Sequence, residues 1–278
     1  MVTSGAPADR RESTAEITAH PSLADYATEV YAVAAAEIQK LYHDPFELFT
    51  RAVQPVLWLM LFGEVMAQVR GVASGNLPYL DFLSAGILAQ SALFVAIFYG
   101  IAAIWERDLG VLQRYLVSPA PRSALVLGKA ISAGARALSQ ALIVYILALL
   151  LGVGIDLQPL SIIGVVFAIL VGSALFSTLS LIIACIVKTR ERFMGIGQVI
   201  TMPIFFASNA IYPLSLMPVW LKIVSRANPL TYEVDALRSL MLVKGTSDYG
   251  LPLDFAILLG TTAVLTAIAA RLYGRMGY

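Results

Sequence analysis

Long stretches without a charged residue are the feature that most restricts how this chain of 278 residues can fold. A helix needs about 20 consecutive apolar residues to cross the hydrocarbon core of a membrane, which is about 30 Å thick. Five charge-free stretches of this kind occur, and a sixth apolar stretch contains one acidic residue. Only 13% of the residues are charged, whereas soluble domains average about 25%. The chain is therefore predicted to be an all-α integral membrane protein with six transmembrane helices.

The predicted transmembrane segments are bounded by charged residues, glycine or proline. In chain order they are Ala52–Val69, Asp81–Glu106, Arg136–Gly154, Asp156–Lys188, Phe193–Pro213 and Asp254–Arg271. The first contains Glu64, and the fifth is interrupted by Pro203, Asn209 and Pro213. A charged residue inside a membrane is costly, so Glu64 is a candidate functional residue.

Lysine and arginine are distributed unequally between the two sides of this arrangement. With a cytoplasmic N-terminus, thirteen of them lie inside, and Arg136 stays at the inner end of the third segment. The five that lie outside are Arg70, Lys222, Arg226, Arg238 and Lys244. Cytoplasmic loops carry an excess of Lys and Arg. Both termini are therefore predicted to be cytoplasmic.

The region before the first segment is more polar than the rest. Residues 1–22 are predicted to be a disordered cytoplasmic tail. Residues 23–44 have apolar positions at helical spacing, Ser22 and Asp25 resemble a capping box, and Asp44 precedes a proline. This helix is too polar to span, so we expect it to lie along the membrane surface. An ordinary helix packed on a soluble partner is the alternative.

The largest inner connection, residues 106–129, reads ERDLGVLQRYLVSPAPRSALVLGK. Its first part, 106–116, fits a short amphipathic helix with Leu109, Leu112 and Leu116 on one face. Such a helix suits the docking of a soluble partner, and a solvated loop that only fixes topology is the alternative.

A nucleotide site and a metal site are both excluded by spacing. Gly128-Lys129 lacks the P-loop glycine and the hydroxyl residue, because Ser123 and Ala130 occupy those positions. Neither the single cysteine, Cys185, nor the two histidines lie at metal-ligand spacing from an acidic cluster. The chain is therefore predicted to be no enzyme and to carry no metal or cofactor, so that any ATP is hydrolysed by another polypeptide.

The outer connection, residues 213–240, is half apolar and broken by prolines. It fits two short helices hinged at Asn228-Pro229. We expect them to dip back into the outer leaflet, provided that protein buries their broken backbone. A plain extracellular amphipathic cap is the alternative.

Aromatic and polar residues inside the spans are candidates for a substrate path, although packing is the commoner role of any one aromatic residue. The candidates are Trp58, Phe62, Glu64, Phe94, Phe98, Tyr99, Phe205, Phe206 and Asn209.

Three blocks carry a resemblance to a known family: RAVQPVLWLMLFGEVM at 51–66, ERDLGVLQRYLVSP at 106–119 and NPLTYEVDALR at 228–238. The sequence resembles the permease subunit of type-2 ATP-binding-cassette (ABC) exporters, especially the daunorubicin-resistance and nodulation-factor export branch. The second block departs from the family pattern at Val111, where a threonine is frequent. The resemblance covers about residues 23–275.

This resemblance implies an architecture and a set of roles. Residues 23–44 would be the connecting helix, 46–275 the six-helix transmembrane domain and 213–240 the re-entrant outer helices. Residues 106–116 would be the coupling helix, which contacts the ATPase through Glu106, Arg107, Asp108, Leu109, Gly110, Leu112 and Arg114. The outer gate would contain Pro218, Trp220, Asn228, Pro229 and Tyr232.

The same resemblance implies partners and a location. Two permease copies, as a homodimer or a closely related heterodimer, would work with two ATPase subunits that bind ATP and Mg in a prokaryotic plasma (inner) membrane. No nucleic acid is expected as a partner.

The apolar spans favour export of an amphipathic compound, such as a drug, a natural product or a glycolipid. A polysaccharide or lipo-oligosaccharide permease is the alternative. An ion-coupled secondary transporter usually has charges near the membrane midplane and repeated halves, and neither feature is evident. A membrane-embedded enzyme fits less well, because no nucleophile–base pair or carboxylate pair occurs on the spans.

Overall fold

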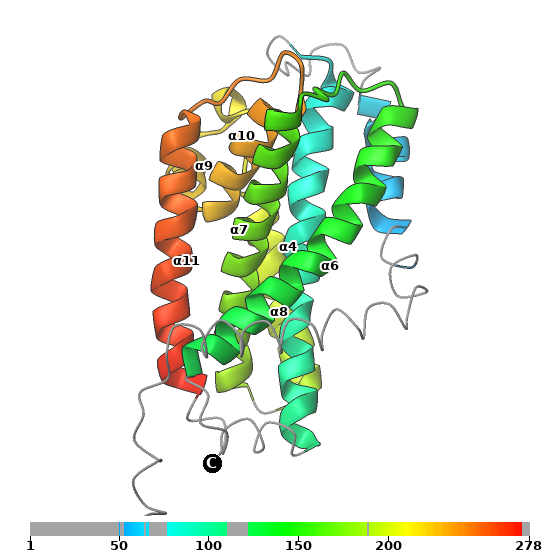
Figure 1. The fold of residues 1–278 in the computed structure, drawn as a ribbon. Helices are drawn as coiled ribbons and strands as arrows, with labels where there is room; N and C mark the ends of the chain where they lie inside the picture. The colour runs from blue at the N-terminus through cyan, green and yellow to red at the C-terminus, as the bar shows by residue number, and fades with distance from the viewer. Residues whose placement is uncertain are drawn as a thin grey trace, which may run out of the picture.

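The computed structural model describes residues 50, 53–63, 65–66, 77–109, 122–187 and 189–273, which form a bundle of helices (Figure 1). The long helices are α4 (Tyr79–Asp108), α6 (Arg122–Leu150), α7 (Pro159–Ile186), α8 (Arg190–Phe206) and α11 (Leu251–Tyr273). The short elements are the π-helix η1 (Trp58–Gly63), the 3-10 helix η2 (Leu214–Leu216), α9 (Val219–Ala227) and α10 (Pro229–Met241). The described residues contain no β-strand, only one isolated bridge between Ile155 and Leu242.

Within the described residues, four helices are long and apolar enough to cross a membrane. They are α4, α6, α7 and α11, and they correspond to the second, third, fourth and sixth predicted segments. The first segment contains a shorter apolar helix, Val53–Gly63, and the fifth contains α8 with 17 residues. The structure thus confirms a helical protein with four candidate spans, whereas six crossings and cytoplasmic termini stay predictions.

The helix that contains the third segment begins earlier than the predicted span. It is α6, which begins at Arg122, so the inner connection is shorter than predicted. Two cations that the sequence placed at or before the inner end of this segment lie within the helix. Lys129 Nζ lies 2.5 Å from Glu106 Oε2, and the Arg136 guanidinium lies 5.4 Å from the centre of the Tyr99 ring. Bounding a segment by its charged residues makes such a helix look shorter than it is, because the sequence does not show which partners neutralise those charges.

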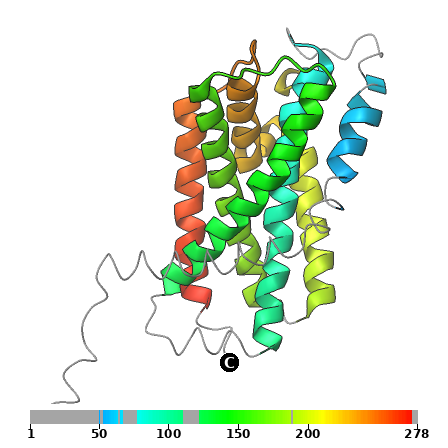
Figure 2. The same ribbon diagram turned by 45° about the vertical axis from the view of Figure 1, so that its right-hand side comes forward.

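The helix α7 lies at the centre of the bundle and packs against α4, α6, α10 and α11. Figure 2 shows α6 crossing α4 obliquely. The buried face of α7 is rich in small residues: Ala168, Gly172, Ser173, Ser177, Thr178 and Ala184. Small residues let helix backbones approach closely in membrane proteins. On α4, a Cβ at Gly86 would lie 2.2 Å from the Ala210 carbonyl oxygen, so only glycine fits there.

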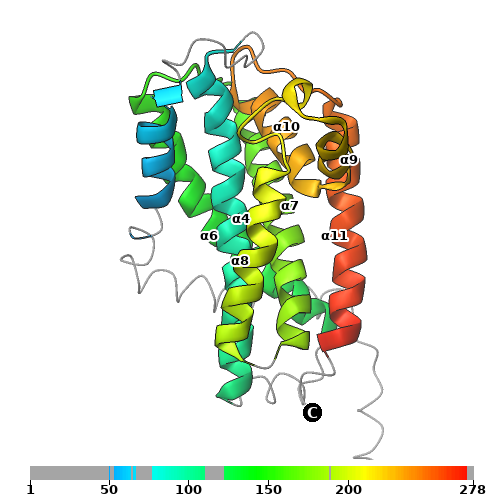
Figure 3. The same cartoon turned by 180° about the vertical axis from the view of Figure 1, so that it is seen from behind.

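The outer connection contains the two short helices that the sequence predicts, and they meet at Asn228. Figure 3 shows α9 and α10 at the end of the bundle opposite the last turn of α11. Most of α10 is buried, from Leu230 to Met241, and it packs against α4, α7 and α11. Because its backbone is covered by protein, α10 is not a plain amphipathic cap. Its depth in a membrane stays a prediction.

Several predictions fall outside the described residues. These are the tail 1–22, the interfacial helix 23–44, Glu64, and the part of the coupling helix from Gly110 to 116. The first residues of the predicted coupling helix, 106–108, form the last turn of α4.

Candidate functional site

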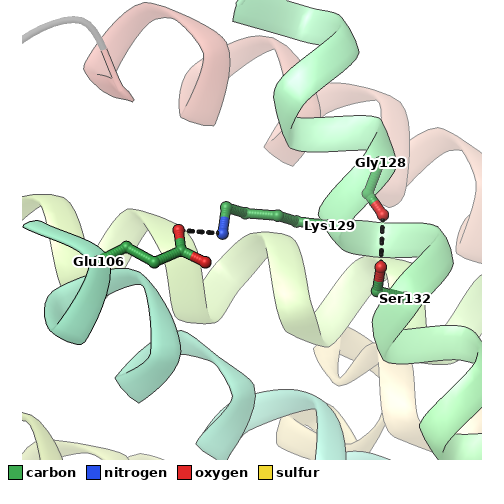
Figure 4. A network of polar contacts seen from close by, with 4 residues as sticks. All are labelled: Glu106, Gly128, Lys129 and Ser132. Atoms are coloured by element: carbon green, nitrogen blue, oxygen red, sulfur yellow. Dashed lines mark hydrogen bonds and ion pairs between the residues drawn. The ribbon is translucent and has the colours of Figure 1, made fainter. Parts of the chain in front are cut away.

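The C-terminal end of α4, which the sequence predicts to be its inner end, is joined to α6 by a buried ion pair. Glu106 comes from the last turns of α4 and Lys129 from the start of α6, and the two side chains point toward each other (Figure 4). Both residues are almost fully buried, and Lys129 Nζ donates to Glu106 Oε2 over 2.5 Å. Close by, the Ser132 hydroxyl donates to the Gly128 carbonyl over 2.9 Å. Burying either charge alone would be expensive, so the pair fixes how the two helix ends sit together.

A second, more exposed ion pair joins the same end of α4 to α8. Arg190 Nη2 lies 2.9 Å from Asp108 Oδ2, and the Arg190 guanidinium lies 3.7 Å from the centre of the Trp105 ring. About a third of each charged side chain is exposed, 34% for Arg190 and 39% for Asp108. Arginine is suited to this position, because one guanidinium can bind a carboxylate and cover an aromatic face.

The predicted coupling residues therefore divide into two groups. Glu106 faces inward to Lys129, Asp108 faces Arg190, and Leu109 is 69% exposed. The Arg107 side chain and the residues Gly110, Leu112 and Arg114 lie outside the described part. The segment that follows Leu109 thus leaves the bundle where α4, α6 and α8 are tied together.

The opposite end of α8 is bonded to α10. Asn228, at the N-terminus of α10, donates from its side-chain nitrogen to the Ile204 carbonyl in the last turn of α8 (2.6 Å). Arg238 Nη2 donates to the Asn209 carbonyl just after α8 (2.8 Å). The Arg238 guanidinium also lies 3.8 Å from the centre of the Phe82 ring on α4. The sequence counted Arg238 among the cations of the outer side, and the structure buries it, because a carbonyl, an aromatic ring and nearby carboxylates converge on it.

Acidic side chains of α10 and α11 share contacts with the outer loop. Ser247 Oγ lies within hydrogen-bond distance of carboxylate oxygens of Asp235 (2.8 Å) and Asp254 (2.9 Å). The Tyr249 amide also donates to Asp235 (3.1 Å). Burial raises the pKa of the neighbouring Asp248 carboxyl, and the negative charge of Asp235 raises it further. This outer loop is therefore fastened to α10 by polar contacts.

Glu233 is a buried carboxylic acid in the middle of α10. It is fully buried, and neither carboxyl oxygen has a hydrogen-bond partner among the described residues. Its carboxyl group packs on Gly172 of α7, where an added Cβ would lie 2.2 Å from the Glu233 Oε1 atom. Burial raises the pKa of Glu233 well above its ordinary value, which favours the neutral form. Sequence reasoning missed this residue, although the block NPLTYEVDALR visibly contains two acids, Glu233 and Asp235.

The predicted outer-gate residues do not all lie together. The side-chain oxygen of Asn228 accepts from the Leu230 amide (3.0 Å), and Pro229 occupies the first turn of α10. The Tyr232 hydroxyl donates to the Arg226 carbonyl (2.7 Å). These three residues therefore fix the hinge between α9 and α10. Trp220, in contrast, is 66% exposed, and Pro218 immediately precedes α9.

The aromatic candidates for the substrate path form separate groups. Trp58 packs edge-on against Phe62 (5.1 Å) and Phe205 (5.9 Å), and Phe206 packs on Phe205. Phe94 and Phe98 form a pair on α4, with 6.0 Å between their ring centres.

The two remaining candidates within the described part are Tyr99 and Asn209. Tyr99 lies under the Arg136 guanidinium. The side chain of Asn209 is buried, and its backbone carbonyl accepts from Arg238.

A cavity of about 400 Å³ lies beside the Phe94–Phe98 pair. Its wall consists of neutral polar and apolar side chains from the first segment, α4 and α6: Thr50, Gln54, Pro55, Gln90, Ser91, Phe94, Val95, Phe98 and Gln140. Sequence reasoning found the two phenylalanines but missed the three glutamines, because it searched the spans for charge. Neutral amides inside otherwise apolar helices were the available signal.

The long apolar helices, with polar and charged groups enclosed between them, define a multi-pass helical membrane protein. Residues 28–242 match the model of the ABC-2 type transporter family. The chain therefore belongs to this family of transport permeases and is not itself an enzyme.

Three relatives illustrate the range of the family. The chain is 31% identical to a putative transport permease, ycf38, of Cyanophora paradoxa, over 72% of this chain and 70% of the relative. It is 25% identical to the daunorubicin resistance ABC transporter permease protein DrrB1 of Streptomyces coeruleorubidus, over 83% and 81%. It is also 25% identical to nodulation protein J of Rhizobium leguminosarum bv. trifolii, over 70% and 74%.

Proposed function

We propose that this protein is the permease subunit of an ATP-driven exporter that moves an amphipathic compound out of the cytoplasm or the inner leaflet. Two permease copies and two separate ATPase subunits would form the working transporter in a prokaryotic inner membrane, with both termini cytoplasmic. ATP and Mg would be bound by the ATPase subunits. Family membership supports this assignment, because ABC-2 permeases normally work with an ABC ATPase.

The observation that carries the proposal is the set of ion pairs at the inner end of α4. The predicted coupling helix follows directly from this end, and Glu106–Lys129 and Asp108–Arg190 tie it to α6 and α8. A force applied by the ATPase to residues 106–116 would therefore reach three helices at once. A flexible loop without such contacts would absorb the same force by changing its own backbone.

The helix α8 gives this force a route to the outer side. Its first residue, Arg190, contacts α4, and the carbonyl of Ile204 near its other end accepts from Asn228 of α10. We propose that α8 shifts as a body and moves the hinge between α9 and α10, which opens or closes the outer end of the path. Exchange between two packed arrangements of helices is an established form of conformational switching.

The amphipathic class of substrate is supported by apolar spans and by the names of relatives that concern daunorubicin resistance and nodulation. The alternative is a polysaccharide or lipo-oligosaccharide export permease, and nodulation protein J keeps this alternative open. An ion-coupled transporter is the least favoured, because family membership points to ATP.

The test is transport by the permease reconstituted in proteoliposomes together with an ABC ATPase from the same organism. We expect ATP-dependent movement of daunorubicin or of a fluorescent lipo-oligosaccharide, and ATP hydrolysis that substrate stimulates. Transport driven by a proton or sodium gradient without ATP would instead establish an ion-coupled transporter.

The coupling role is tested in the same vesicles with Glu106→Ala combined with Arg107→Ala, and separately with Asp108→Ala. Both variants should insert normally but lose substrate-stimulated ATP hydrolysis, because the ATPase would no longer move α4. Lys222→Ala, on the outer helix α9, removes a charge far from this end and serves as the control. Unchanged stimulation and transport in both variants would overturn the assignment of residues 106–116.

A further inference from the structure

We propose that the cavity beside Phe94 and Phe98 binds the uncharged, polyhydroxylated headgroup of an amphipathic ligand. The inference extends the proposed export function by naming a binding site and a chemical class of ligand. As a statement about binding, it is testable without the ATPase.

The position of the cavity makes its polar lining unusual. Gln90 and Ser91 lie well inside the candidate span Tyr79–Glu106, and Gln140 lies inside the span Val126–Leu150. Both glutamines are almost fully buried. Placing an amide in an apolar environment costs free energy unless it makes hydrogen bonds. The amide groups gathered around this cavity offer hydrogen-bond donors and acceptors to a polar ligand at a depth where such groups are uncommon.

The lining combines hydrogen-bonding groups with an aromatic surface. The amides of Gln54, Gln90 and Gln140 can both donate and accept hydrogen bonds. A sugar hydroxyl also donates and accepts, so it matches an amide in either direction. The Phe94 and Phe98 rings offer an apolar face to the ring carbons of a sugar. Ligand sites commonly join a mainly apolar wall to a few placed polar groups.

The described residues that line this cavity are uncharged, which disfavours ionic headgroups. None of the nine described lining residues is acidic or basic. The nearby Arg136, one helical turn before Gln140, lies over the Tyr99 ring. An ammonium or phosphate group entering the cavity would lose water without gaining an opposite charge, which is strongly unfavourable.

An apolar groove continues along the same helix as the cavity. It has a volume of about 390 Å³ and is lined by Leu57, Trp58, Leu61, Phe62 and Val65. Gln54, Leu57, Leu61 and Val65 recur about every third or fourth residue, so they lie along one helix face. A headgroup in the cavity would thus leave an attached alkyl or aromatic tail beside the groove. This arrangement fits a glycolipid or an uncharged glycoside better than a cationic drug.

The size of the cavity restricts the ligand as well. Its volume of about 400 Å³ falls at the small end of ligand pockets, which range from about 300 to 1,000 Å³. One or two sugar rings match this space, whereas a long polysaccharide would have to pass through without being enclosed.

The test is photolabelling of the full-length permease in lipid nanodiscs. Three probes share one diazirine-bearing decyl chain and differ only in the headgroup, which is maltoside, phosphate or trimethylammonium. We expect the maltoside probe to label peptides of α4, α6 or residues 53–66, with saturation and with competition by unlabelled decyl maltoside. The two charged probes should label these peptides at least about tenfold less at equal concentration.

The variants Gln90→Leu and Gln140→Leu should each lower maltoside labelling about fivefold, because each removes a ligand hydrogen bond. Gln198→Leu is the matched control, since this glutamine lies exposed on α8 outside the cavity. Unfolding temperatures identify a variant that fails to fold, and the label map of the unmodified protein remains decisive in that case. Equal labelling by all three headgroups, or a label on other helices, would overturn the site.

The two proposals fail in different ways. If the labelling pattern holds but proteoliposomes show no ATP-dependent transport, the export function fails and the binding site stands. If transport occurs but maltoside labelling shows no preference for the cavity, the inference about this site alone fails.

Discussion

The two ends of the bundle hold their helices together by different means. At the inner end, the contacts between α4, α6 and α8 are ion pairs between side chains, one of them partly exposed. At the outer end, α10 is embedded among α4, α7 and α11, and its polar side chains bond largely to backbone groups. Partly exposed ion pairs are weak and exchangeable, whereas buried polar contacts are costly to break. The difference indicates that the contact between α4 and α8 can exchange, whereas the buried Glu106–Lys129 pair and the outer helix α10 are held firmly.

Removing the Arg238 guanidinium should have the largest effect on this comparison. In Arg238→Met, the Asn209 carbonyl loses its donor, and Asp235 loses a nearby positive charge. Breaking a buried ionic contact on one side costs about 3–5 kcal/mol. We expect a loss of this size in unfolding titrations with sodium dodecyl sulfate in mixed micelles. Lys244→Met, at an exposed position nearby, should change stability by less than about 0.5 kcal/mol; equal effects would contradict the buried role.

Two glycines of α4, Gly86 and Gly100, allow the tightness of packing at the two ends of the bundle to be compared. A Cβ at Gly86 would meet the Ala210 backbone at 2.2 Å, whereas one at Gly100 would first meet the Ser180 hydroxyl and the Phe193 ring. Side chains can move aside more easily than backbone. Gly86→Ala should therefore cost about 3 kcal/mol and Gly100→Ala about 1 kcal/mol in the same titration, within the usual range for overpacking.

The control for these glycines is Gly260→Ala on α11, where an added Cβ would meet nothing within 4 Å. This change should be neutral or stabilise the protein by up to about 1 kcal/mol, because alanine is the better helix former. A Gly100→Ala variant less stable than Gly86→Ala would reverse the proposed difference between the two ends.

Glu233 should make the outer end sensitive to pH. Its pKa is raised by burial, so the folded protein keeps a proton that the unfolded chain releases above about pH 4.5. Stability should therefore fall as pH rises from that value toward the raised pKa, by at most about 1.4 kcal/mol per pH unit. Glu233→Gln should lessen this slope, with Asp248, whose pKa burial also raises, supplying part of the remainder. Glu191→Gln, exposed on α8, should leave the slope as it is. A slope that Glu233→Gln does not change would assign the effect to other groups.

The smallest effect is expected at the Asp108–Arg190 pair. A double-mutant cycle with Asp108→Asn and Arg190→Gln should give a coupling free energy of about 0.2–1 kcal/mol, since both side chains are partly exposed. The coupling should weaken between 0.05 and 0.5 M salt, at roughly the ionic strengths where screening lengths become short. A coupling free energy above about 3 kcal/mol that does not change with salt concentration would mean that this contact is held as firmly as the buried contacts of α10.

The sequence by itself determined the helical class and the four longest helices. Apolar runs such as Asp156–Lys188 have no stable alternative to a buried or membrane-spanning helix, because their backbone polar groups must be paired internally. The break at Asn228-Pro229 was also readable, since Asn caps a helix and Pro favours its first turn. The blocks 106–119 and 228–238 carried the family resemblance that the comparison confirms.

Only the tertiary structure decided which polar residues meet. The early start of α6 depends on Glu106, which neutralises Lys129 from another helix. The burial of Glu233 depends on Gly172, which leaves room for its carboxyl group. The cavity depends on Gln90 and Gln140 facing one space from two helices. A hydropathy scale gives the free-energy cost of burying each polar residue by itself. The contacts that compensate for this cost come from residues far away in the chain.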